Sequence, residues 1–198
     1  MLERQIDCGL LEEIWEQTNN IKHKSEVEKM LEINGLKYIS CPRPSNSKGV
    51  SYGGVAIEAN LEWFTLEEIK INAPKNLEVI CGLLKPKFQD SKFKRIIVCS
   101  FCSPPNKRRN SNMADHIVST LQILSARYPN SGLILGADRN EMDILHVLNC
   151  GLNLWHMVNM GTWHGKILDI IIMNMKSYYN SAIIVPPGVQ SSFQDNQV

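Results

Sequence analysis

The sequence predicts a layered domain of mixed α+β class in which strands outnumber helices. Short apolar segments with strand character recur along the chain, from residues 36–40 to residues 166–174. Helical periodicity is clear in only two stretches, 25–34 and 113–128, and a third short candidate lies at 142–149. Strands and helices must bury their apolar faces against one another, so this pattern favours an α+β or α/β sandwich.

Length and composition are those of one ordinary globular domain. The chain has 198 residues, of which 43% are apolar, and its 21 basic residues nearly balance its 20 acidic ones. A chain of this size can bury about 70% of its unfolded surface, so we expect one domain over 1–185 and a polar tail over 186–198. The near-zero net charge excludes binding of nucleic acid through bulk positive charge.

The sequence also bears on the compartment. No apolar run reaches the roughly 18 residues that a membrane span needs, so we expect no membrane partner. The first residues are charged and have no long apolar core, unlike a signal peptide. The expected location is therefore intracellular, either cytoplasmic or nuclear.

The N-terminal part of the chain predicts one helix. Residues 9–17 are largely apolar without a decisive period. Residues 25–34 read as a helix that begins at a capping box between Ser25 and Glu28 and ends at Gly35. A short strand at 36–40 then enters a loop rich in Pro, Ser and Gly.

Further strands follow in quick succession, at 53–60, 66–72, 77–84 and 95–101. The segment 66–72 alternates between apolar and polar residues, as a half-solvated strand does. The segment 95–101 begins with a continuous apolar run, which is typical of a central strand. These differences predict a sheet that has a buried central strand and at least one strand with a solvent-exposed face.

The second half of the chain alternates helices and strands. Residues 103–112 read as a loop, and 113–128 as the clearest helix because its apolar residues recur on one face. The later segments comprise a buried strand at 132–140, a short helix at 142–149, strands at 153–158 and 166–174, and a further strand candidate at 181–188.

Six cysteines are too few for a disulfide scaffold and favour a reducing setting. Cys81 and Cys99 sit inside apolar runs and are expected to be small core residues. Cys99 and Cys102 form a lone C-x-x-C at the end of a strand, where residues three apart point to opposite faces. We therefore expect no metal or redox pair at these two positions.

Polar residues interrupt otherwise apolar segments at three places: Glu13, Asp138-Arg139-Asn140 and Asp169. A carboxylate within an apolar strand costs several kcal/mol unless it is paired, hydrogen-bonded or bound to a metal. The residues alone leave two interpretations open. Asp138 and Asn140 either shape a turn, with Asp169 at a pocket edge and Glu13 solvated, or all of them form one site.

Motifs that follow in a fixed order along the chain support the interpretation that these polar residues form one site. They are LLEEIWEQ, YGGVAIEAN, LEVICGLLKP, IIVCSFCSPP, YPNSGLILGADRNEMD and GTWHGKILDIIIMN. Together they resemble the endonuclease/exonuclease/phosphatase superfamily, and more narrowly the endonuclease domain of non-LTR retrotransposon proteins, over roughly residues 6–175. The resemblance implies a four-layer αββα sandwich with the active site at the strand ends.

The resemblance also implies roles for particular residues. Glu13 would bind Mg²⁺ or Mn²⁺, Asp138 would orient or deprotonate the attacking water, and Asn140 would hold the phosphate. Asp169 would orient the catalytic histidine of the family. These residue types suit the hydrolysis of DNA phosphodiesters, because a hard cation takes oxygen ligands and an amide can bind a phosphate without adding charge. No small-molecule cofactor is implied.

The sequence departs from the family pattern in ways that predict weak catalysis. The opening strand with its Asn and the closing strand with its Asp-His pair are not found, so we expect a chain truncated at both ends. Cys102 stands where the family has Tyr, and Trp163 where Arg commonly follows Thr. Two alternatives to a nuclease therefore stay open: a non-catalytic remnant that binds nucleic acid weakly, and a phosphatase acting on a small phosphoester.

Two groups of residues are candidates for contact with DNA. Lys107, Arg108 and Arg109 follow a proline-rich turn and can bind phosphates, although a solvated loop is the more common explanation of such a short charge run. Trp163, next to His164, can stack on a base or simply pack at the rim of the fold. DNA is the expected partner, and the sequence leaves the oligomeric state open.

Overall fold

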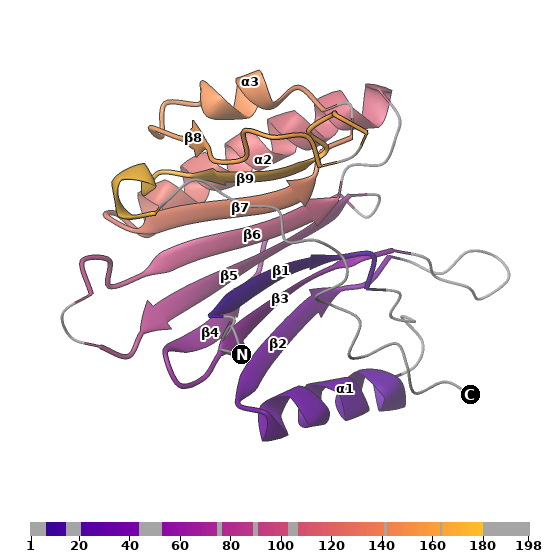
Figure 1. The fold of residues 1–198 in the computed structure, drawn as a ribbon, viewed down its shortest axis with the longest axis vertical. Coiled ribbons are helices and arrows are strands. Elements are labelled where there is room, and N and C mark those ends of the chain that lie inside the picture. The colour runs from indigo at the N-terminus through magenta and orange to yellow at the C-terminus, as the bar shows by residue number, and fades with distance from the viewer. Residues whose placement is uncertain are drawn as a thin grey trace, which may run out of the picture.

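The computed structural model describes residues 7–14, 21–43, 53–74, 77–88, 91–102, 107–140, 142–162 and 164–179. Two sheets face one another, with α1 outside one sheet and α2 and α3 outside the other (Figure 1). The four-layer αββα sandwich that the sequence analysis expected is confirmed. Within the described residues, no helix is long and apolar enough to cross a membrane.

The first sheet has three antiparallel strands in the order β1-β3-β2. These are β1 (Cys8–Glu12), β2 (Leu36–Cys41) and β3 (Val55–Asn60), and α1 (Ile21–Ile33) packs against β2. Glu12 and Cys41 both pair with Val55, the first residue of β3. The last residues of β1 and β2 therefore lie at the same edge of the sheet.

The second sheet has six strands in the order β4-β5-β6-β7-β9-β8. Its strands are β4 (Phe64–Ile69), β5 (Glu78–Pro86), β6 (Ile96–Cys102), β7 (Gly132–Asp138), β8 (Trp155–His156) and β9 (Asp169–Met173). Only β6 and β7 of the paired strands run parallel, and α2 (Lys107–Arg127) connects them as the crossover that a parallel pair requires. Every residue of β6 is buried, so the predicted central strand is confirmed.

The core is divided between two layers. On β5, Val79, Cys81 and Leu83 belong to the cluster that packs on α2, whereas Ile80 and Leu84 belong to the cluster between the sheets. This division follows from the alternation of side chains along a strand. The same alternation determines which polar side chains at the strand ends point into the space between the two sheets.

Two helix starts were predicted wrongly. α1 begins at Ile21 and not at Ser25, so the capping box lies inside the helix, while Gly35 ends it as predicted, with φ of 74°. α2 begins at Lys107, within the segment expected to be a loop. Nothing from 107 to 112 is Pro or Gly, so the polar composition there contains no helix breaker.

The cysteine predictions are confirmed in part. Cys81 and Cys99 are core residues, and Cys99 and Cys102 belong to opposite faces of the sheet. The structure also joins Cys81 and Cys99 as a disulfide, which the sequence analysis did not expect. The reason is their register, because the two residues are direct partners across β5 and β6, with Cα atoms 4.3 Å apart.

The remaining predicted elements agree in type. The short helix is α3 (Ile144–Leu148). Asp143 caps its N-terminus, where the Asp143 carboxylate accepts a hydrogen bond from Leu145 N. The strand expected over 153–158 has only two residues, Trp155 and His156. The strand candidate at 181–188 and the tail at 186–198 lie outside the described residues.

Candidate active site

Four polar side chains form a line across the end of the six-stranded sheet. Glu78 is the register partner of Cys102, Cys102 of Asp138, and Asp138 of Asp169. Directly paired residues point to the same face of a sheet, and Cys102 lies in the core between the two sheets. These four residues, here called the polar row, therefore face the three-stranded sheet.

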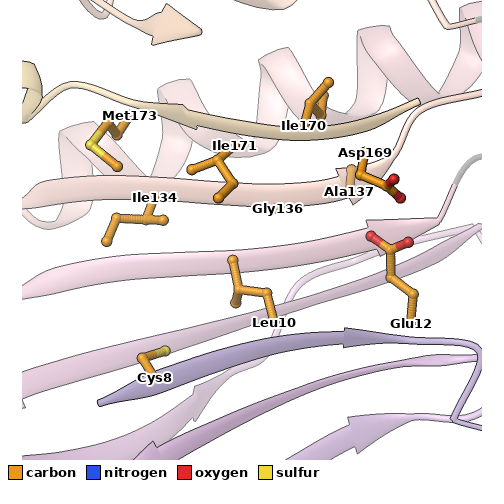
Figure 2. Close-up of a pocket in the computed structure, with 10 residues that line it drawn as sticks. All are labelled: Cys8, Leu10, Glu12, Ile134, Gly136, Ala137, Asp169, Ile170, Ile171 and Met173. Atoms are coloured by element: carbon orange, nitrogen blue, oxygen red, sulfur yellow. The ribbon is translucent and has the colours of Figure 1, made fainter. Parts of the chain in front are cut away.

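Glu12 faces the polar row from the opposite sheet. Its carboxylate, at the end of β1, points toward that of Asp169 (Figure 2). The pKa of Glu12 is raised to about 8, mainly by burial and then by the negative charges of Asp138, Asp169 and Glu13, while a hydrogen bond from the Asp138 backbone acts in the opposite direction. The carboxylates are thus close enough to disfavour simultaneous ionisation.

The turn after β7 fixes Asp138. The backbone N–H of Asn140 donates to Asp138 Oδ1 at 3.0 Å, and Asn140 adopts a left-handed φ of 46°. Burial raises the pKa of Asp138, hydrogen bonds from Asn140 lower it, and the charge of Asp169 raises it. Asp138 therefore shapes the turn and also presents its carboxylate to the polar row, so the two interpretations of the sequence are compatible.

The segment before β9 fixes Asp169. Thr162 Oγ1 accepts hydrogen bonds from the backbone N–H groups of Leu168 and Asp169, at 3.0 and 3.1 Å. Arg139 binds the same region from the other side, because its Nε donates to the carbonyl of Ile167 at 3.0 Å. The backbone that carries Asp169 is therefore held by side chains from both neighbouring turns.

Glu13, the predicted metal ligand, lies beside the polar row and turns toward Arg43. Glu13 Oε1 is 3.7 Å from Arg43 Nη2, and about half of the Glu13 side chain is exposed. Its charge still raises the pKa of Asp138. Glu13 has a left-handed φ of 51°, a strained conformation for glutamate of the kind that concentrates at functional sites.

Three members of this site were not predicted from the sequence. Glu12 was passed over for its neighbour, although the doubled glutamate of LLEEIW was a visible signal. Arg43 and Glu78 had no visible signal, because they are 35 residues apart and meet only in the fold, where Arg43 Nε donates to Glu78 Oε1. Gly54 N donates to the second oxygen of Glu78 at 2.9 Å.

Cys102 is unsuited to nucleophilic chemistry. Burial raises the pKa of its thiol to about 12, and the charges of Glu78, Glu12 and Asp138 act in the same direction. The thiol therefore stays protonated at neutral pH, and the reactive form of cysteine is the thiolate. Its role in the polar row is that of a small neutral side chain.

The predicted DNA contacts are placed only in part. Lys107, Arg108 and Arg109 occupy the first turn of α2, and the positions of their side chains lie outside what the structure describes. Trp163 also lies outside the described residues. The proposed contacts of these four residues with DNA therefore stay predictions.

A pocket of about 480 Å³ opens between β1 and the strands β7 and β9. One end is polar, with the carboxylates of Glu12 and Asp169, and the rest is largely apolar (Figure 2). The other residues that line it are Cys8, Leu10, Ile134, Gly136, Ala137, Ile170, Ile171 and Met173. The pocket is thus continuous with the polar row.

The donor set fits a divalent hard cation. Glu12, Asp138 and Asp169 supply carboxylate oxygens, and their mutual repulsion is what a bound cation would relieve. In the described part of the chain, no group of three or more His, Cys, Asp or Glu side chains is placed so that it could hold a metal ion as it stands. Mg²⁺ commonly binds through one or two carboxylates and keeps several waters, so this looser arrangement is compatible with it.

Comparison with known proteins gives structural likeness without sequence likeness. No protein-family model and no curated protein matches the sequence. The human Nocturnin catalytic domain superposes with a TM-score of 0.64 at 18% identity, over 85% of this chain and 69% of that one.

Two proteins of Bacteroides thetaiotaomicron are also similar. An endonuclease/exonuclease/phosphatase family protein gives a TM-score of 0.57 at 15% identity, over 77% of this chain and 66% of that one. A mannosyl-6-phosphatase gives 0.58 at 15% identity, over 86% and 72%. At these identities the likeness shows the fold, which is of the endonuclease/exonuclease/phosphatase type.

Proposed function

We propose that this chain is a metal-dependent phosphodiesterase that nicks DNA, of the kind carried by non-LTR retrotransposon proteins. The observation that supports this proposal most strongly is the approach of Glu12 to Asp138 and Asp169 across the two sheets. Carboxylates whose charges raise the pKa of a partly buried neighbour such as Glu12 are costly unless they serve a ligand. A divalent cation and a phosphate together satisfy such a site.

In this proposal Glu12 holds the cation, with Glu13 beside it and Asp138 on the facing strand. When bound, Mg²⁺ or Mn²⁺ supplies positive charge for the phosphoryl oxygens. Asp138 takes the proton of the attacking water, a role suited to a carboxylate whose pKa burial raises. Asn140, which hydrogen-bonds to Asp138, keeps that carboxylate oriented and offers an amide to the phosphate.

DNA is proposed as the substrate because a run of basic residues follows the polar row closely in the sequence. Lys107 is five residues after Cys102, so its Cα lies at most about 18 Å from the row. Lys107, Arg108 and Arg109 can therefore reach the phosphates that flank the one being cleaved. Action on DNA places the protein inside the cell, in the cytoplasm or the nucleus.

Turnover is expected to be slow. The polar groups that the structure places around the row are carboxylates, one thiol, one amide and the guanidinium groups of Arg43 and Arg139. The histidine and tyrosine of the resembled family have no counterpart among them. Loss of one such transition-state contact typically lowers the rate by about 10²–10³-fold.

Nicking of supercoiled plasmid in Mg²⁺ or Mn²⁺ tests the proposal. We expect slow nicking by the wild type and none by Asp138→Ala. Asp115→Ala is the control, because Asp115 is an exposed carboxylate on α2 that pairs with His146 at 3.0 Å. Nicking that Asp138→Ala leaves unchanged, or no nicking at all, contradicts the proposal, and the second result favours a non-catalytic remnant.

A phosphatase acting on a small phosphoester is the second candidate. The pocket of about 480 Å³ beside Glu12 and Asp169 has the size of a small-molecule site, and a mannosyl-6-phosphatase shares the fold. Comparing p-nitrophenyl phosphate with bis-p-nitrophenyl phosphate separates the two functions. A phosphatase hydrolyses the monoester faster, whereas the proposed phosphodiesterase prefers the diester.

A further inference from the structure

The site described above is strongly acidic, which poses a problem for an anionic substrate. Glu12, Glu13, Glu78, Asp138 and Asp169 all lie in or beside the polar row. A phosphodiester carries a negative charge and is repelled by unneutralised carboxylates. One divalent cation offsets only part of this charge, so a fixed cation of the protein is needed where the phosphate enters.

Arg43 is held beside the row by a buried carboxylate. Glu78 is only 7% exposed, and its two oxygens accept hydrogen bonds from Arg43 Nε and from the backbone N–H of Gly54. A buried charge with two charge-assisted hydrogen bonds is rigid. Glu78 thereby fixes the guanidinium through its Nε side.

Two glycines shape the backbone under this guanidinium. Gly53 and Gly54 have left-handed φ values of 104° and 102°. A Cβ on Gly53 would lie 2.6 Å from Arg43 Nη2, and a Cβ on Gly54 would lie 2.9 Å from the Cα of Pro42. Only glycine allows Arg43 to lie flat against this turn while Gly54 donates to Glu78.

The terminal nitrogen Nη2 of Arg43 lies on the side of Glu13. Nη2 is 3.7 Å from Glu13 Oε1, an ion pair that is longer than a hydrogen bond, and the Arg43 side chain is 36% exposed. A phosphate oxygen can therefore replace or join Glu13 at this edge. The planar guanidinium suits bidentate recognition of phosphate.

Arg139, the other arginine that the structure places near the row, is engaged differently. Its Nε donates to the Ile167 carbonyl at 3.0 Å and its Nη1 to the Met142 carbonyl at 3.1 Å. These bonds join two loops of the protein itself. The contacts of Arg43, by contrast, are with the side chains of Glu78 and Glu13 at the polar row itself.

We propose that Arg43, anchored by Glu78, binds a phosphate of the substrate directly at the polar row. This inference rests on the proposed function, because it takes the ligand to be a phosphodiester. It assigns to Glu78 a positioning role and to the Gly53-Gly54 turn the task of presenting the guanidinium. It also explains why a buried glutamate is kept in a site that already has several acids.

Binding of a fluorescent DNA oligonucleotide in Ca²⁺, followed by anisotropy, tests the inference. Arg43→Gln keeps an amide that can donate to Glu78 and removes the charge, so it is expected to weaken binding about 10–100-fold. Arg43→Lys keeps the charge without the planar fork and should lose less. Lys85→Ala is the control, since Lys85 pairs with Glu67 at the opposite end of β5 and should bind as the wild type does.

Oligonucleotides with one neutral methylphosphonate identify the phosphate. In the wild type, a methylphosphonate at one position should weaken binding by about the same factor as Arg43→Gln weakens binding of unmodified DNA. In Arg43→Gln, a methylphosphonate at that same position should weaken binding little further. Equal losses in both proteins at every position, or wild-type affinity in Arg43→Gln, overturn the inference. Plasmid nicking by the wild type reports on the proposed function independently of this result.

Discussion

The carboxyl group of Glu12 connects stability, pH and metal binding. Its pKa is raised from 4.5 to about 8, chiefly by burial, so the folded protein holds a proton there that the unfolded chain has released. Between these two values folding takes up a proton, and stability must therefore fall as the pH rises. The stabilisation is fully present below about pH 4.5 and is lost as the pH passes about 8.

Glu12→Gln should remove this pH dependence. The substituted amide cannot ionise, so the free energy of unfolding should be flatter from about pH 5 to about pH 8 and higher than that of the wild type by about 3–5 kcal/mol at the upper end. Urea unfolding at several pH values measures the difference. Glu68→Gln, at an exposed position of β4, is the matched control, and an equal slope in wild type and Glu12→Gln contradicts the account.

Divalent cations should stabilise the protein through the same carboxyl group. A cation that binds only the folded chain at 100 times its dissociation constant adds about 2.7 kcal/mol. Because the cation competes with the proton on Glu12, the rise in Tm with Mg²⁺ or Mn²⁺ should be larger near pH 8 than near pH 6. Thermal melts of the wild type, Glu12→Gln and Glu13→Gln measure this effect.

The two glutamate variants decide which residue holds the cation. If Glu12 does, Glu12→Gln loses the stabilisation and Glu13→Gln keeps most of it. The reverse result would support the role that the family resemblance gives to Glu13. Equal stabilisation of all three proteins would place the cation elsewhere and contradict the site.

At the scale of elements, the turn before β3 determines how the two sheets meet. Gly54 has a φ of 102°, and its N–H donates to the buried Glu78. Gly54→Ala should cost about 3 kcal/mol or more, because it adds backbone strain, a clash with Pro42 and the loss of a hydrogen bond to a charge.

Gly151→Ala is the matched control for that substitution. Gly151 also has a positive φ, 86°, but nothing lies within 4 Å of the Cβ it would gain. It should therefore lose only the strain energy, about 1–2 kcal/mol. Chemical unfolding of both variants measures the difference, and equal losses would mean that the Gly54–Glu78 contact contributes nothing to stability.

The helices and strands show how much of the fold could be predicted from the sequence. The strands 36–40, 53–60 and 95–101 were predicted because apolar runs and alternation reflect burial, which is local information. The start of α2 was missed because a polar composition without Pro or Gly does not distinguish a loop from a helical turn. The disulfide was missed because register across β5 and β6 is a long-range property.

The candidate site, like the fold, was predicted only in part from the sequence. Asp138, Asn140 and Asp169 stood out as polar residues in or after apolar strands, and the structure brings Asp138 and Asp169 together as register partners. Glu12 and Glu13 could not be told apart, because neighbours on a strand point to opposite faces and a shift of one residue exchanges them. Only the pairing of β1 with β3 settles that Glu12 ends the paired strand.

At the scale of the whole molecule, the two sheets differ in width. The described part of the first sheet has three strands and the second has six, and the pocket lies where β1 faces β7 and β9. Its wall includes Leu10, Ile134 and Met173, together with Ile171, which is 36% exposed. Accessible apolar surface of this kind binds hydrophobic dyes and promotes association.

The native protein should therefore bind anilinonaphthalene sulfonate through this pocket. Ile171→Thr should lower the dye fluorescence several-fold with a change in stability of less than about 1 kcal/mol, because position 171 is partly solvated. Ile123→Thr, on the exposed face of α2, is the control. Absence of dye binding by the wild type would mean that the pocket is covered in solution.

The central claim is that the carboxylates of the two facing sheets form one divalent-metal site. Anomalous diffraction from crystals grown with Mn²⁺ tests it most directly. The account predicts a peak about 2.0–2.4 Å from a carboxylate oxygen of Glu12, with Asp138 or Asp169 bound directly or through water. A peak bound only by surface carboxylates such as Asp115, or no peak at the polar row with the cation in excess, would contradict the account.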